Sequence, residues 1–153
     1  MALWQFTIRI VPKKTFIETQ GSIPSKVSYE EFIDLPTWEI NKYEAQLSHL
    51  LSNYFSKDES QAEFRTSWGK SDETTFLLSR DENNIGDLTV RLDLRSLTQD
   101  LLKVVEEVGN LLDAVLVTEL GSVIDPKIKI ILEEMKASKA FRFVSDPRGF
   151  FDT

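Results

Sequence analysis

The sequence predicts an α+β fold: a single mostly antiparallel sheet of about five strands, with two or three helices packed mainly on one face, including one βαβ unit. Two patterns support this prediction. Several short segments alternate apolar and polar residues, which is typical of strands with one buried face. Longer segments repeat apolar residues every three or four positions, which is typical of amphipathic helices. The length of 153 residues favours a single domain over residues 1–153.

The βαβ unit is predicted between residues 87 and 125. Its first strand is indicated by apolar residues at alternate positions, namely Leu88, Val90, Leu92 and Leu94. Its helix is indicated by apolar residues at helical spacing, namely Leu101, Leu102, Val105, Val108, Leu111 and Leu112. Burial of these side chains contributes on the order of 10 kcal/mol before conformational entropy is subtracted.

Two starting points are open for this helix. Ser96 has the spacing of a capping box with Gln99, and Thr98 is an equally suitable N-cap. After the helix, residues 114–117 are apolar at every position, which predicts a strand inside the sheet. Strand, helix and strand together form the predicted βαβ unit.

The N-terminal part of the chain is predicted to begin with a strand over residues 2–11, where apolar and polar side chains alternate. Pro12 ends this strand, because proline cannot donate a hydrogen bond to a neighbouring strand. Residues 13–27 contain Gly21 and Pro24 and are expected to form a loop.

Two helical segments are predicted next. Ser28 and Glu31 have the spacing of a capping box, which indicates a short helical turn before Pro36. Apolar residues at helical spacing then indicate an amphipathic helix from about Ile40 to Phe55.

An antiparallel meander is predicted from three alternating segments, at residues 64–68, 74–80 and 88–95, which are separated by turn-forming residues. Gly121 and Ser122 are expected to close a hairpin after the strand at residues 114–117.

A last helix is predicted with Asp125 as N-cap, Pro126 as first residue and its end near Ser138. Aromatic residues follow it and are expected to be packed, because exposed they would form an apolar patch; they are Phe141, Phe150 and Phe151.

The composition excludes several classes of partner. A formal charge of -7 and a pI near 4.8 argue against nucleic acid, because phosphate binding requires clustered lysine and arginine. A basic protein is the better expected partner. No segment is apolar enough to cross a membrane, and the N-terminus does not have the pattern of a signal peptide, so we expect a cytoplasmic location. The absence of cysteine agrees with that compartment.

The residue types also argue against catalysis. The chain has no cysteine and a single histidine, His49, which lies off the apolar side of its predicted helix. A cysteine nucleophile is therefore excluded, and neither a serine triad nor a dedicated transition-metal site is expected. No glycine-rich phosphate loop occurs. We therefore expect no enzyme activity, no metal and no cofactor.

Acidic residues gather in the segment from Glu30 to Glu63, where only two lysines oppose them. Such a segment is commonly a solvated helical face. The functional alternative is a docking face for a basic protein, with four candidate contact residues: Glu30, Glu31, Glu39 and Glu44.

The polar face of the predicted sheet is a second candidate site. If the strands align as predicted, one uncovered surface holds the candidate ligand-binding residues Arg9, Arg65, Arg91, Asp93 and Arg95. Arginines can form bidentate contacts with carboxylates, so this surface suits an acidic patch of a partner or a small anion. Cross-strand ion pairs that only solubilise the sheet are the structural alternative. Asp93 is the best candidate for a catalytic group, but no convergent acid and base accompany it.

The C-terminal segment resembles one that closes small uncharacterised bacterial proteins, with the pattern S-x-A-x-R-F-V-x-D-P-x-x-F; here it comprises Ser138, Ala140, Arg142, Phe143, Val144, Asp146, Pro147 and Phe150. In size, acidity and lack of catalytic residues, the chain is also similar to immunity proteins that neutralise bacterial toxins. The resemblance covers about the last 65 residues and implies no site residues.

The sequence therefore predicts a non-catalytic protein-binding protein, with a toxin-neutralising immunity protein acting through an acidic surface as the specific form. The alternative is a domain that binds a small anion or ligand with the arginines of the sheet. A homodimer is a further open alternative.

Overall fold

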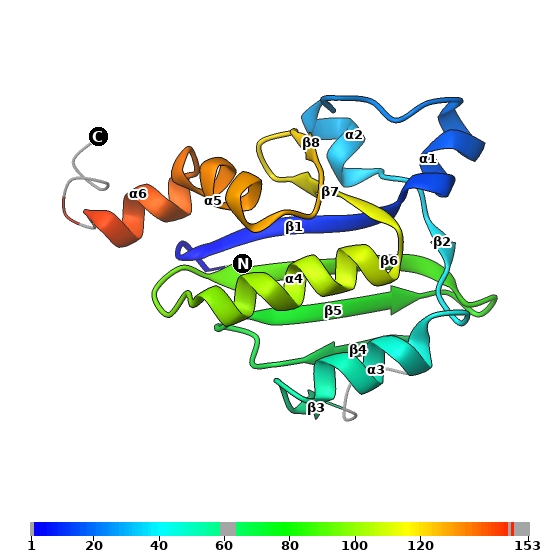
Figure 1. The fold of residues 1–153 in the computed structure, drawn as a ribbon, viewed down its shortest axis with the longest axis horizontal. Coiled ribbons are helices and arrows are strands. Elements are labelled where there is room, and N and C mark those ends of the chain that lie inside the picture. The colour runs from blue at the N-terminus through cyan, green and yellow to red at the C-terminus, as the bar shows by residue number, and fades with distance from the viewer. Residues whose placement is uncertain (1, 59–63, 147, 149–153) are drawn as a thin grey trace.

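The computed structural model describes residues 2–58, 64–146 and 148, which form one sheet of eight strands and six helices (Figure 1). The α+β class and the mostly antiparallel sheet are as predicted, but the strand count of about five was too low. Five strands match the predicted ones: β1 (Gln5–Pro12), β4 (Arg65–Trp68), β5 (Thr75–Arg80), β6 (Ile85–Asp93) and β7 (Ala114–Thr118). The other three have only two residues each, which is too short for an alternating pattern: β2 (Trp38–Glu39), β3 (Lys57–Asp58) and β8 (Val123–Ile124). Of these, β8 pairs antiparallel with β7 and so confirms the hairpin predicted at Gly121 and Ser122.

The strands follow the order β3-β4-β5-β6-β1-β7-β8, and β2 pairs with the start of β6. Both β6 and β7 pair antiparallel with β1, so they run parallel to each other with β1 between them. Helix α4 (Gln99–Leu111) connects β6 to β7 across one face of the sheet (Figure 1). The predicted βαβ unit is therefore present, with the first strand of the chain inserted into it. Thr98 caps the helix, since its side chain accepts a hydrogen bond from the backbone of Leu101.

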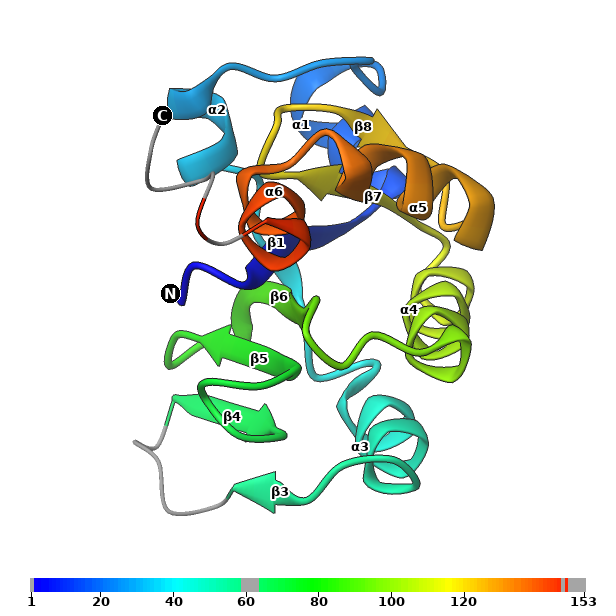
Figure 2. The ribbon, with the colours of Figure 1, turned by 90° about the vertical axis from the view of Figure 1, so that its left-hand side faces the viewer.

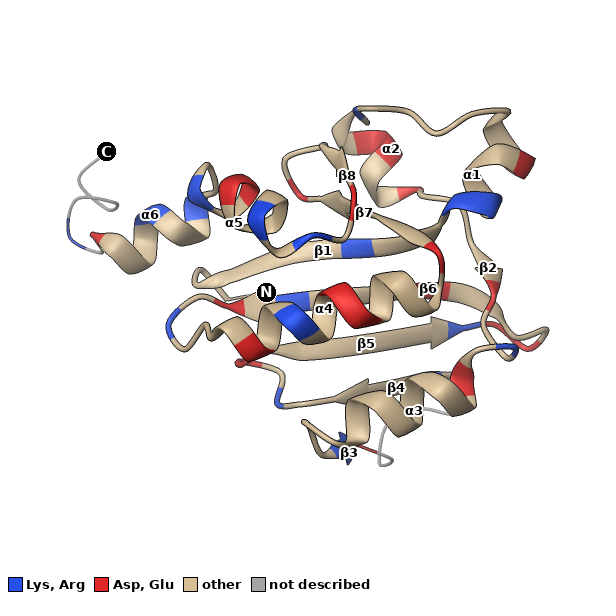
Figure 3. Cartoon of the chain, viewed as in Figure 1, with Lys and Arg blue, Asp and Glu red and all other residues tan. Residues whose placement is uncertain are grey.

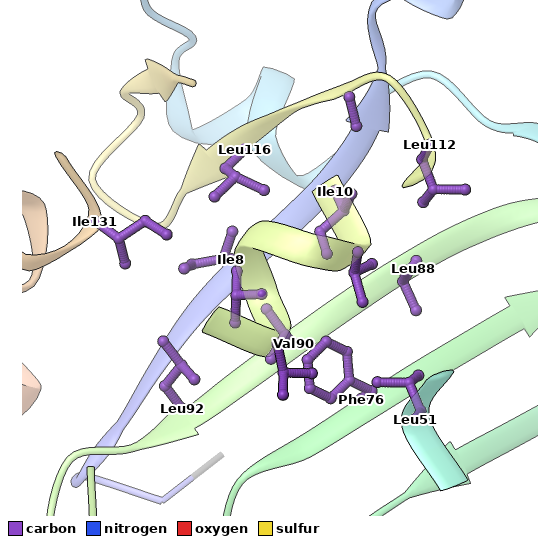
Figure 4. Packing of buried hydrophobic residues seen from close by; sticks show 14 of the residues in the cluster. Ile8, Ile10, Leu51, Phe76, Leu88, Val90, Leu92, Leu112, Leu116 and Ile131 are labelled. Atoms are coloured by element: carbon purple, nitrogen blue, oxygen red, sulfur yellow. The ribbon is translucent and has the colours of Figure 1, made fainter. Parts of the chain in front are cut away.

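The main core lies between α4 and the sheet. Apolar side chains of the three central strands point towards α4 and are fully buried, among them Ile8, Val90 and Leu116 (Figure 4). On the helix, Val105 and Val108 are fully buried as predicted, whereas Leu101 and Leu111 are partly exposed. The helix surface that packs on the sheet is thus shifted slightly from the predicted one, and it includes Val104.

Three more helices pack on the same side as α4: α3 (Glu44–Ser52), α5 (Ile128–Lys136) and α6 (Lys139–Ser145). Helix α3 is shorter than predicted, because Trp38 and Glu39 form β2 and the chain turns before Glu44. Helix α5 begins later than predicted, with Lys127 rather than Asp125 as N-cap. Helix α6 was not predicted, although Ser138 caps it with a side-chain acceptor. Phe150 and Phe151 lie outside the described residues.

The opposite face of the sheet carries a smaller core under α1 (Lys13–Gln20) and α2 (Tyr29–Ile33). Its buried members are Val11, Phe16, Leu35, Val115 and Val117. The prediction of a loop over residues 13–27 was wrong for Lys13–Gln20, which form α1 directly after β1. The sequence did not reveal this helix, because only Thr15 and Phe16 of α1 are buried and its sequence therefore lacks a regular apolar repeat. The predicted capping box is confirmed, with Ser28 N donating to Glu31 Oε1 at 3.0 Å and Glu31 N donating to Ser28 Oγ at 3.1 Å.

Gly109 should not tolerate a side chain, although alanine is normally the better helix residue by about 1 kcal/mol. A Cβ atom at Gly109 would lie 2.4 Å from Cβ and 2.9 Å from Cγ of Pro126, whose ring cannot turn away. We therefore expect Gly109→Ala to lower the free energy of unfolding by about 1–3 kcal/mol. Urea denaturation measures this, with Asn110→Ala on the exposed side of α4 as a control that should be neutral or stabilising. A stabilised Gly109→Ala variant would contradict the packing of α4 against Pro126.

Candidate functional site

The sheet has one face that helices cover only in part. Helices α3, α4, α5 and α6 pack on one side, whereas α1 and α2 lie over the β1, β7 and β8 end of the other side. Figure 2 shows that no described helix lies over β4, β5 and β6 on that second side. We call this part of the sheet, from β4 to β6, the open face.

Strand register determines which side chains share the open face, because residues directly opposite each other in neighbouring strands point to the same side. Leu77 of β5 lies between Ser67 of β4 and Thr89 of β6. Arg91 of β6 lies between Thr75 of β5 and Thr7 of β1. The open face therefore has a partly exposed apolar side chain at its centre, surrounded by hydroxyl groups.

Arg91 lacks the partners that a partly buried arginine normally has. Its Nε–H group is buried, and no described residue places a hydrogen-bond acceptor within range of it. The described residues also give its guanidinium no ion pair. A buried donor without a partner costs about 1–3 kcal/mol, so such groups are uncommon and call for an explanation.

Arg91 lines an open cavity of about 860 Å³ that begins on the open face and continues around the β4–β5 turn. Its described lining includes four basic residues, Lys57, Arg65, Lys70 and Arg91, and two acidic residues, Asp58 and Glu73. The cavity is thus locally basic in a chain with a formal charge of -7. Among the described residues, Arg65 and Lys70 have no ion-pair partner either, whereas Lys57 lies 5.9 Å from the centre of the Trp68 ring.

A second cavity, of about 460 Å³, lies beside α1 and β2 and differs in its electrostatics. It also contains two lysines, but each has a carboxylate neighbour. Lys14 Nζ lies 3.6 Å from Glu18 Oε1, and Lys42 Nζ lies 3.1 Å from Glu39 Oε2. Unpaired positive charge is therefore a property of the first cavity and not of the second.

Arg9 shares the sheet face with Arg91 but has a structural task. Its Nη1 donates to the backbone carbonyls of Phe32 at 3.0 Å and Ile33 at 3.1 Å, and its Nη2 forms an ion pair with Asp87. Only 12% of its side chain is exposed. Arg9 therefore fastens the C-terminal end of α2 to the sheet and is not available to a ligand.

Asp93 and Arg95 form a second structural pair, at the end of β6. The Asp93 side chain is 2% exposed and accepts hydrogen bonds from the backbone N of Arg95 at 2.9 Å, from its Nε at 3.0 Å and from its Nη2 at 2.8 Å. Burial alone would raise the pKa of Asp93, but the hydrogen bonds and charge of Arg95 outweigh it, so the pKa lies below its ordinary value. The Arg95 guanidinium also stacks 3.9 Å above the Trp4 ring. The Asp93 carboxylate and the Arg95 guanidinium thus pair with each other.

The four glutamates predicted to form an acidic docking face do not form one surface (Figure 3). Glu30 and Glu31 belong to α2, whereas Glu44 belongs to α3 on the other side of the sheet. Glu44 forms an ion pair with Arg80, and Glu39 pairs with Lys42. Hydrogen bonds from Ser28 hold the pKa of Glu31 below its ordinary value. The sequence could not reveal this division, because β2 carries the chain from one face to the other.

Of the five residues predicted on the sheet, the structure brings Arg65 and Arg91 to the open cavity and gives the other three internal partners. Two further lining lysines escaped prediction. Lys57 lies in the two-residue strand β3 and Lys70 lies in the β4–β5 turn, so no strand or helix period marks either of them.

No protein-family model, no curated protein and no solved structure matches the chain. Within residues 2–58, 64–146 and 148, no helix has the length and apolarity needed to cross a membrane. The same residues contain no group of three or more His, Asp or Glu side chains placed to hold a metal ion.

The Asp93–Arg95 pair should stabilise the protein in a pH-dependent way. Because the folded-state pKa of Asp93 is lowered, its contribution is present above the unfolded value of about 3.9 and is lost as the pH falls through the folded value. We expect Asp93→Asn to lower the free energy of unfolding by about 1–3 kcal/mol at pH 7. The difference from the wild type should shrink below about pH 4 in urea denaturation series. A difference that stays constant from pH 7 to pH 3 would show that the ionised carboxylate is not responsible.

Removal of the Arg9 guanidinium should loosen α2 specifically. We expect Arg9→Gln to speed hydrogen exchange at the backbone amides of Phe32 and Asp34, because two carbonyl contacts and one ion pair are lost. The amides of Val105 and Val108 in α4 should keep their exchange rates. Hydrogen exchange followed by NMR distinguishes these two regions. Equal acceleration in both helices would mean that Arg9 stabilises the whole fold rather than α2.

Proposed function

We propose that the protein is a binding protein that recognises an anionic group at the open cavity between β4, β5 and β6. The observation that supports this proposal is Arg91, a partly buried arginine in a basic cavity whose Nε has no acceptor and whose guanidinium has no counter-ion among the described residues. A carboxylate or phosphate in the cavity supplies the missing counter-ion to this partly exposed side chain.

The position of Arg91 suits such recognition. Its strand lies in the middle of the sheet between β5 and β1, so the backbone that carries the guanidinium is held by hydrogen bonds on both sides. Groups on rigid elements keep their geometry better than groups on loops. Its cross-strand neighbours Thr75 and Thr7 are uncharged, so neither of them forms an ion pair with the Arg91 guanidinium.

The other proposals have less support. An acidic surface that neutralises a basic toxin would have to use glutamates that lie on two faces and are largely engaged in local contacts. A catalytic Asp93 would have to act as a base, but its lowered pKa and the hydrogen bonds from Arg95 oppose proton uptake.

Anion binding should depend on Arg91. In a titration with sodium phosphate followed by backbone NMR shifts at low ionic strength, we expect the amides of Thr75, Leu77 and Thr89 to shift. Arg91→Gln should weaken this binding by about tenfold, because a charge-assisted hydrogen bond contributes about 1.5–3 kcal/mol. Added sodium chloride should weaken it further.

Lys103→Gln is the matched control, because it removes one exposed positive charge from α4 on the other side of the sheet. This variant should bind phosphate like the wild type. Equal affinities for the wild type and Arg91→Gln would refute the proposed site.

A further inference from the structure

Two arginines of the open cavity lie at opposite corners of the open face. Arg65 of β4 pairs with Ser79, and Arg91 of β6 pairs with Thr75, on either side of β5. The two positions are therefore separated by two strand spacings across the sheet and by four residues along it. With about 4.8 Å between strands and about 3.4 Å per residue, their Cα atoms lie about 17 Å apart.

A single small anion does not suit this separation. Side chains stand roughly perpendicular to a sheet, so the two guanidinium groups remain well apart. A charge-assisted hydrogen bond requires about 2.7–2.9 Å between nitrogen and oxygen, and with both side chains upright on the sheet one phosphate or carboxylate does not meet that distance at both corners. A ligand that uses both arginines must carry two anionic groups on an extended frame.

The surface between the two corners indicates what that frame is. Leu77 occupies the midpoint of the diagonal, because it lies between Thr75 and Ser79 along β5, and it is partly exposed. Thr89 flanks it on β6 with a partly exposed hydroxyl group, and Ser67 lies buried on its other side in β4. An apolar centre with hydrogen-bonding groups around it complements a polypeptide, which offers an apolar side chain and backbone amides together.

We propose that the open face binds an extended acidic segment of a partner protein, which crosses β5 diagonally from Arg65 to Arg91. This inference rests on the proposed function and names its ligand. In an extended segment, side chains at positions i, i+2 and i+4 point to one side and span about 14 Å. Acidic residues at i and i+4 therefore reach the two arginines, and an apolar residue at i+2 lies on Leu77.

The charges of the protein fit this arrangement. The formal charge of -7 repels an acidic partner over much of the surface, and the basic residues that line the cavity oppose this repulsion locally. Local positive charge at the cavity therefore favours an acidic segment there and adds to the strength of the contact.

Labelled heptapeptides test the proposal by fluorescence anisotropy at low ionic strength. The peptide GETLTEG has the predicted spacing, GTLTEEG has the same charge with adjacent acids, and GQTLTQG has no acids. We expect GETLTEG to bind at least about tenfold more tightly than GQTLTQG, and more tightly than GTLTEEG. Arg91→Gln should weaken its binding by about tenfold and Arg65→Gln by about threefold, because Arg65 is more exposed.

Control variants show whether a loss of binding comes from the proposed site. Lys103→Gln should leave both peptide binding and the phosphate shifts at Thr75 and Thr89 unchanged, because it lies on the other side of the sheet. Circular dichroism checks that each variant is folded, and a second variant, Arg65→Lys, keeps the charge and should retain most of the affinity.

The outcomes distinguish this inference from the function on which it rests. If phosphate binds in an Arg91-dependent way but GETLTEG binds no more tightly than GTLTEEG or GQTLTQG, the acidic segment is refuted and the anion site stands. If Arg65→Gln does not weaken GETLTEG, the diagonal placement is refuted. If neither phosphate nor any peptide binds, both proposals fail.

Discussion

The burial of α4 against β6, β1 and β7 is the interaction on which the rest of the structure depends. Because β1 lies between the two strands that α4 connects, the helix has to cross the middle of the sheet, and its apolar side then covers all three strands. Val105 and Val108 are inaccessible to solvent there, as are Ile8 and Val90 beneath them. The N-terminal strand is thus held in place by β6, whose paired residues lie 78 to 88 positions later in the chain.

This crossing also makes the two faces of the sheet unequal. Helices α3, α5 and α6 extend the layer started by α4, so the large core lies entirely on that side. Among the described residues, the other side has only the short helices α1 and α2 over the β1, β7 and β8 end. The face of β4, β5 and β6 that is left without a helix has polar side chains at nearly every position, which keeps it compatible with solvent. An uncovered polar sheet face is where the chain can present rigidly held charges.

The arginines on that face differ in their surroundings rather than in their chemistry. Arg9 lies next to α2, so its guanidinium is used by two helix carbonyls and by Asp87. Arg95 lies two residues after Asp93 and is used by that carboxylate. Arg91 lies between two threonines and retains unused hydrogen-bonding capacity. Availability for binding therefore follows from which element covers each side chain.

The sequence by itself determined the local elements. The alternation of Leu88, Val90 and Leu92 specified β6, the spacing of Val105 and Val108 specified α4, and the Ser28–Glu31 box specified the start of α2, because each pattern lies within one short segment. Only the tertiary structure decided the two-residue strands, the helix α1 and the division of the acidic residues between two faces. It also decided which arginine is free, because ion pairs and carbonyl contacts join residues distant in sequence, such as Arg9 and Asp87. A local pattern records whether a side chain faces the core, but the partner across the sheet depends on how distant strands align.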